Sequence, residues 1–225
     1  MKIFIYWNYK DNDSKKIYQF LKNSTFLEKL KEENTVTIKK MFSNFILDED
    51  IINAVAESDV IMFFTHGEED SILKFRYKNE DVKDQFIFIN TDNAGILKGK
   101  KVLAFCCSSA TILGEYCCSE KVKSKFYIGF KKDIIYGEGF QNEFRSIMYS
   151  SYSEAFEKAL LKAYQEQWTA DNFVQMLRIF ISQMLTKKIL SSSDRRLGSF
   201  SSASRHLETA NSLVALGEST ELVFG

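Results

Sequence analysis

The sequence has no proline, only two histidines and four cysteines among its 225 residues, and its 30 basic and 30 acidic side chains cancel. The absence of proline excludes PxxP recognition motifs and cis-proline turns. Any imidazole chemistry must use His66 or His206. The zero net charge argues against a protein that mainly binds nucleic acid or an anionic membrane, because such proteins usually carry a basic excess.

Long apolar runs are missing as well. No run reaches the roughly 18 residues that a membrane span needs, and the apolar run at Ile3–Trp7 is too short for the core of a signal peptide. We therefore expect a soluble, cytoplasmic protein whose cysteines are reduced. Hydrophobic residues make up 45% of the chain and aromatic residues 14%, which is enough to build one large core. We expect a single domain over residues 1–225.

Short apolar segments alternate with helical patterns along the chain. Strands are predicted at Ile3–Trp7, Thr35–Phe42, Asp59–Thr65, Ser71–Tyr77, Gln85–Asn90, Lys101–Cys106, Lys125–Phe130 and Glu221–Phe224. The fourth and fifth of these are expected to form a hairpin or an edge extension. Helices are predicted at Ser14–Lys31, Asp48–Glu57, Ser109–Val122, Tyr152–Gln167 and Asp171–Leu185. This alternation predicts an α/β fold with a mostly parallel sheet and helices on both faces.

Two of the predicted strands end in residues that can carry chemistry. The strand Asp59–Thr65 runs into His66 and Gly67, and the strand Lys101–Cys106 runs into Cys107. In parallel sheets, functional groups gather just past the carboxyl ends of the strands. Neighbouring strands can thus bring an imidazole and a thiol together, as a thiol nucleophile requires. Gly67 has no Cβ, so a substrate can come close and its N–H can point at a developing oxyanion.

These two segments resemble a known family. DVIMFFTHGEED (59–70) and KVLAFCCSS (101–109) are similar to the two signature blocks of the caspase-like (clan CD) cysteine peptidases, and most similar to those of the CHAT domain. Weaker similarity at KFYIGF, SEAFEKALLKAY and ALGESTELVF extends it from about residue 55 to the end. The resemblance implies a caspase-like (flavodoxin-like) fold. It also implies a catalytic dyad of His66 and Cys107, with the N–H groups of Gly67 and Cys107 as the oxyanion hole.

The resemblance selects Cys107 over Cys106 because Ser109 then stands where CHAT domains carry Ser or Thr. The caspase motif Gln-Ala-Cys-Arg-Gly is absent, so cleavage after Asp is not implied. The implied activity is that of a cysteine endopeptidase. In prokaryotes such domains often act as effectors of immunity or cell death, linked to CRISPR or other defence systems and switched on by a sensor. We therefore expect a protein substrate and an activating protein partner, and no nucleic acid, membrane or cofactor.

Other residues are weaker candidates. Glu68, Glu69 and Asp70 follow the His-Gly motif, and Asp133 follows the strand Lys125–Phe130, so these acids could contact a basic substrate residue or simply be solvated. The remaining cysteines, Cys106, Cys117 and Cys118, are expected to pack in the core. Adjacent cysteine pairs do not have the CxxC spacing of zinc sites, and no metal site is expected.

The C-terminal region is polar before its last predicted strand. The Ser-rich stretch 191–204 is predicted to be a mobile loop, with Arg195 and Arg196 exposed in it, and His206 is expected at the surface.

Two alternatives to a peptidase stay open. The chain could be a catalytically silent caspase-like or flavodoxin-like module that binds partners, in which His66 and Cys107 merely pack. It could also be a thiol-dependent hydrolase or transferase for small molecules, which would need a closed pocket. A placement of the two side chains on opposite faces of the sheet would remove the geometric basis of a dyad.

Overall fold

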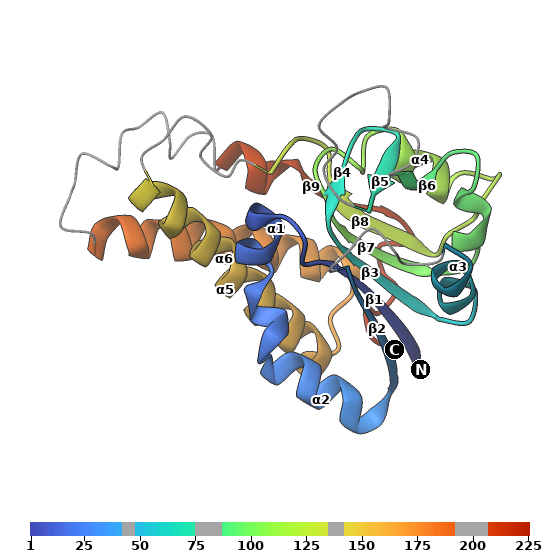
Figure 1. The fold of residues 1–225 in the computed structure, drawn as a ribbon, viewed down its shortest axis with the longest axis horizontal. Coiled ribbons are helices and arrows are strands. Elements are labelled where there is room, and N and C mark those ends of the chain that lie inside the picture. The colour runs from blue at the N-terminus through green and yellow to red at the C-terminus, as the bar shows by residue number, and fades with distance from the viewer. Residues whose placement is uncertain (42–47, 75–86, 135–141, 192–206) are drawn as a thin grey trace.

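The computed structural model describes residues 1–41, 48–74, 87–134, 142–191 and 207–225 (Figure 1). A six-stranded sheet with the order β2-β1-β3-β7-β8-β9 forms its centre. The strands are β1 (Lys2–Asn8), β2 (Thr35–Met41), β3 (Val60–Phe64), β7 (Lys101–Phe105), β8 (Phe126–Phe130) and β9 (Leu213–Gly217). The first five pair in parallel, and β9 runs antiparallel to β8. The predicted α/β fold with a mostly parallel sheet is confirmed.

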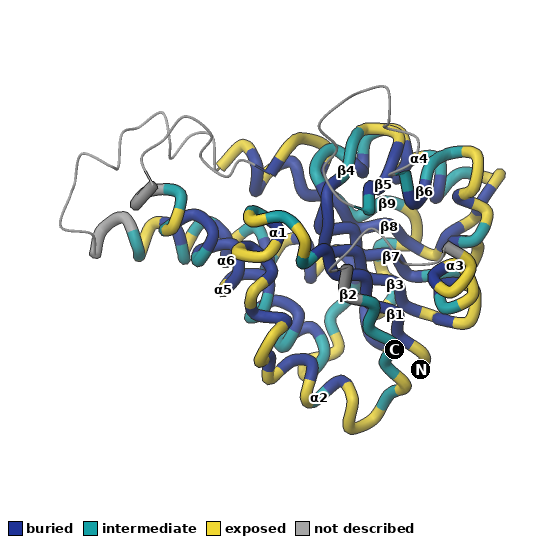
Figure 2. The backbone as a smooth tube through the Cα atoms, in the orientation of Figure 1, coloured by how far each residue is buried: buried dark blue, intermediate teal, exposed yellow. Residues whose placement is uncertain are grey.

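Helices cover both faces of this sheet, also as predicted. One face packs against α1 (Asn12–Ile17), α2 (Thr25–Glu33), α5 (Asn142–Glu166) and α6 (Ala170–Ser191). The other packs against α3 (Asp48–Ala56), α4 (Leu113–Cys118) and the 3-10 helix η3 (Ala94–Leu97). Successive side chains of a strand enter opposite cores, so Phe64 lies in the first and Phe63 in the second. Figure 2 shows the central strands buried along most of their length.

A second sheet stands at the carboxyl end of the first. It contains β4 (His66–Gly67), β5 (Ser71–Leu73) and β6 (Ile87–Asn90), paired antiparallel in that order. A tight turn joins β4 to β5, in which the Glu68 N–H donates to the Ser71 carbonyl at 2.9 Å. The predicted hairpin of β5 and β6 is confirmed, but it belongs to a separate sheet. Residues 75–77 and 85–86 of the predicted strands lie outside the described residues.

Two predicted helices are shorter or broken. The segment Ser14–Lys31 is not one helix, because α1 ends at Ile17 and a 3-10 helix, η1 (Gln19–Lys22), follows it. α2 begins anew after Ser24, whose hydroxyl caps it by accepting the Leu27 N–H. The prediction for Ser109–Val122 is wrong at both ends, since α4 begins only at Leu113 and already ends at Cys118. The other three predicted helices are confirmed: α3 matches closely, while α5 starts earlier and α6 ends later than predicted.

The predicted last strand, Glu221–Phe224, is also wrong. The strand that returns to the sheet is β9, and Phe224 instead packs its ring 5.7 Å from those of Phe26 and Tyr164. The Glu221 carboxylate lies 3.1 Å from the buried Lys101 ammonium, which also donates to the backbone of the last residues. These residues therefore serve as core and anchor rather than as a sheet edge. Residues 192–204 of the predicted loop lie outside the described residues.

No helix in the described part of the chain combines the length and the apolar character that crossing a membrane requires.

Candidate active site

The carboxyl ends of β3 and β7 place His66 and Cys107 in the same register. The two strands are neighbours, Phe64 pairs with Phe105, and their rings stack with centroids 4.8 Å apart. His66 and Cys107 each stand two residues beyond this pair. Cys107 packs against the core that α1, α2, α5 and α6 cover, and the His66 ring contacts α1 on that same face. The imidazole and the thiol thus share one face, whereas Cys106 lies in the opposite core.

The His66 imidazole is nearly buried and is held on one side. Its Nε2 atom lies 3.0 Å from Asp11 Oδ2 and 3.2 Å from Ser14 Oγ. Asp11 caps α1, and its Oδ1 accepts the Ser14 N–H at 2.9 Å. Burial raises the pKa of Asp11, but the hydrogen bond and charge of His66, with the hydrogen bonds of Ser14, outweigh it, so the pKa lies below the usual value.

Asp11 and Ser14 are the members of this cluster that sequence reasoning did not single out. They follow β1, which pairs with β3 directly, so their loop meets the carboxyl end of the strand that carries His66. The signal was present as Asp-x-x-Ser after an apolar run, a common helix start. A helix-cap carboxylate can be recognised as a partner of His66 only when the strand order is known.

The Cys107 thiol is half-buried beneath a segment that we call the strap, residues Lys131–Ile134. The Ile134 N–H donates to Cys107 Sγ at 3.4 Å. The strap is fastened to the cysteine loop, which is residues 106–112 between β7 and α4, because the Ser108 N–H donates to the Lys132 carbonyl at 3.2 Å. A backbone N–H aimed at sulfur favours the thiolate over the thiol.

The Cys107 thiolate is not stabilised by a helix N-terminus, although the sequence predicts a helix that begins at Ser109. Ser108 adopts a left-handed φ of 50°, which turns the chain away from a helical path. The N–H groups of Ile112 and Leu113 then donate to the Glu69 carbonyl of the neighbouring turn. The cysteine loop is therefore held between the β4–β5 turn and the strap.

The acids predicted to line a substrate pocket flank this loop. Glu68 is half-buried and Glu69 exposed in the β4–β5 turn, with exposed Asp70 beside them. Asp133 is exposed in the strap, but its carboxylate accepts a hydrogen bond from Ser108 Oγ at 2.7 Å. Asp133 thus contacts the residue that follows Cys107.

Position 67 requires glycine because the backbone of β4 lies very close to that of Cys106 and Cys107. A Cβ at this position would lie 2.7 Å from the Cys107 carbonyl oxygen and 2.8 Å from Cys106 Cβ. Such distances are shorter than van der Waals contact, so the β4 backbone packs directly on the cysteine loop. The site puts Gly67 and Cys107, the two predicted oxyanion residues, side by side.

The other cysteines are packing residues, as predicted. Burial raises the pKa of the Cys106 thiol well above its usual value, that of Cys117 to about 12 and that of Cys118 to about 11. Among the described residues, no group of three His, Cys, Asp or Glu side chains could hold a metal ion. Arg195, Arg196 and His206 lie outside the described residues.

These environments predict selective alkylation of Cys107. Brief treatment of the folded protein with iodoacetamide at pH 7.5 is expected to add one label, because the raised pKa values of the other three thiols keep them protonated at that pH. Intact-mass and peptide-mass analysis would locate it. The Cys107→Ala variant should take up no label on this timescale, and early labelling at Cys106 would contradict the assignment.

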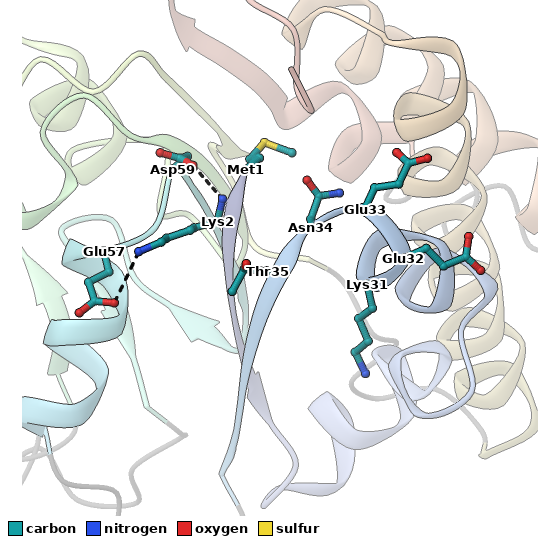
Figure 3. A pocket seen from close by; sticks show the side chains of 9 residues that line it. All are labelled: Met1, Lys2, Lys31, Glu32, Glu33, Asn34, Thr35, Glu57 and Asp59. Carbon is teal, nitrogen blue, oxygen red and sulfur yellow. Dashed lines mark hydrogen bonds and ion pairs between the residues drawn. The ribbon is translucent and has the colours of Figure 1, made fainter.

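A charged hollow lies at the opposite, amino-terminal edge of the sheet (Figure 3). Lys2 crosses it, donating its backbone N–H to Asp59 and placing its ammonium 3.9 Å from Glu57. Its lining contains no cysteine and no histidine, so it is separate from the site of His66 and Cys107.

The sequence matches no family model and no curated protein with which it was compared.

Proposed function

We propose that the chain is a cysteine endopeptidase with a caspase-like fold, in which Cys107 is the nucleophile and His66 carries the proton. The observation that supports this most is the common register of the two residues on neighbouring strands and their common face. The hydrogen bond from the Ile134 N–H to the sulfur adds to it. Two residues that only packed would need neither an anchored ring nor a polar donor at the sulfur.

The proposed reaction is acyl transfer to a thiol. Cys107 gives its proton to His66, and the thiolate attacks the peptide carbonyl carbon. The N–H groups of Gly67 and Cys107 hold the oxyanion, each worth about 3 kcal/mol of barrier lowering. His66 returns the proton to the leaving amine as the C–N bond breaks. Water then hydrolyses the thioester, passing its proton to His66 and restoring the thiol.

The substrate and setting of the proposed enzyme follow from the charges and from the family resemblance. Glu68, Glu69 and Asp133 flank the cysteine loop and favour a protein substrate with a basic residue near the scissile bond. The resemblance to CHAT domains supports a cytoplasmic effector in prokaryotic immunity or cell death that an activating protein switches on.

A comparison of protein N-termini in expressing cells tests the proposal. Cells that make the wild-type protein are compared with cells that make Cys107→Ala or Cys106→Ala, and new N-termini are identified by mass spectrometry. New termini are expected with the wild type and with Cys106→Ala, and none with Cys107→Ala. Identical termini in all three cultures would favour the silent, partner-binding module instead.

A further inference from the structure

We infer that Asp11 is a positioning residue that fixes the tautomer and orientation of His66, so that Nδ1 rather than Nε2 exchanges a proton with Cys107. The inference deepens the proposed function and depends on it for its catalytic meaning. It would make the site a chain of carboxylate, imidazole and thiol on three adjacent strand ends, in the order β1, β3, β7.

The Asp11 carboxylate is itself held in place. Its Oδ1 accepts the Ser14 N–H, and its Oδ2 accepts the side-chain N–H of Asn8 as well as facing His66. Asn8 is fully buried at the end of β1, and its own Oδ1 accepts the Lys10 N–H at 3.0 Å. A carboxylate fastened at both oxygens can orient a ring, whereas a freely rotating one cannot.

The contact determines which ring nitrogen carries the proton. An ionised carboxylate only accepts hydrogen bonds, so Nε2 of His66 must be the donor across the 3.0 Å distance. The neutral ring then has its lone pair on Nδ1, the nitrogen left to accept the proton of the thiol. In the opposite tautomer, the lone pair of Nε2 would face the negative oxygen of Asp11, which is unfavourable.

The Asp11 carboxylate faces the ring that would receive the proton of Cys107. Asp11 stays ionised at neutral pH because its pKa lies below the usual value. Tyr18 is buried beside this cluster as well, and it stays neutral because burial, the two thiols and Asp11 all raise its pKa. Asp13, in the first turn of α1, is paired with Arg145 and Tyr149 instead of His66.

The test compares Asp11→Asn with Asp13→Asn, a matched loss of one carboxylate on the same helix. Asn keeps an acceptor for the Ser14 N–H but turns an amide donor toward Nε2, which favours the wrong tautomer.

We expect kcat to fall by about 10³- to 10⁴-fold for Asp11→Asn and to stay within about threefold for Asp13→Asn. We expect the 15N signals of His66 to report a proton on Nε2 in the wild type and on Nδ1 in Asp11→Asn. Alkylation of Cys107 at pH 6.5 should slow by about tenfold in Asp11→Asn.

The readouts separate this inference from the proposed function. If the wild type cleaves protein and Asp11→Asn cleaves equally well with an unchanged 15N pattern, the inference is overturned and the peptidase stands. If the wild type cleaves nothing, the peptidase proposal fails, and the 15N signals and alkylation rates still decide whether Asp11 fixes the ring. If Asp11→Asn does not fold, Asp11→Ser, which keeps a helix cap but cannot reach His66, takes its place in all three measurements.

Discussion

A His66→Ala variant is expected to lose as much peptidase activity as a Cys107→Ala variant, about 10⁴- to 10⁶-fold in kcat, and the double variant to lose no more than either. The physical reason is that the thiolate forms only if the imidazole takes its proton, so neither group works without the other. Residues that act as a unit give such non-additive losses, whereas independent contributions multiply. The measurement is the cleavage rate of one substrate from the survey of N-termini by all four proteins.

Folding controls are needed because His66 is nearly buried. Removing its ring leaves Asp11 and Ser14 without that partner, which we expect to cost about 1–3 kcal/mol of unfolding free energy. Urea unfolding would confirm that each variant is folded at the assay temperature. Activity retained by either single variant, or a double variant far below both, would show that the two residues do not form a catalytic unit.

Gly67→Ala is expected to lower kcat by about 10²-fold, because an added methyl group displaces the cysteine loop by a fraction of an ångström to an ångström. The atoms that it would meet are the Cys107 carbonyl oxygen and Cys106 Cβ, neither of which is the end of a flexible side chain. The variant keeps its backbone N–H, so the loss would reflect displacement and not a missing donor. Overpacking should also cost about 1–3 kcal/mol of unfolding free energy, read from urea unfolding.

Gly95→Ala is the matched control for this substitution. Gly95 lies in η3, and a Cβ there meets nothing within 4 Å. Its activity should equal that of the wild type, and its stability should change by less than about 1 kcal/mol. Equal activity of the Gly67 and Gly95 variants would mean that the close approach of β4 to the cysteine loop does not matter for turnover.

The sequence predicted the core strands well because burial on both faces leaves a continuous apolar run, as at Val60–Phe64 and Lys101–Phe105. His66 and Cys107 could be paired from the sequence because each follows such a run. Asp11 could not be placed beside His66 from the sequence. It lies in a polar loop after β1, and only the pairing of β1 with β3 shows that this loop meets the strand end before His66. Strand order is a long-range property that local patterns do not contain.

The errors have local physical causes. The helix predicted at Ser109 fails because the Glu69 carbonyl, distant in sequence, takes the N–H groups of Ile112 and Leu113. The segment Glu221–Phe224 has residues that favour a strand, but the Phe224 ring packs against α2 and α5 instead. In both cases a tertiary contact outweighs the local preference of the chain.

The contacts of the strap determine when, during synthesis and folding, Cys107 receives its N–H donor. Residues just before β9 hold the strap in place through three contacts. The Thr209 hydroxyl donates to the Asp133 carbonyl, and Lys132 forms an ion pair with Glu208. The Lys131 N–H donates to the Ser212 carbonyl. Parallel pairings and other long-range contacts form slowly during folding. Cys107 therefore receives the Ile134 N–H only after residues 208–212 have left the ribosome, and in a shorter nascent chain its thiol lacks this donor.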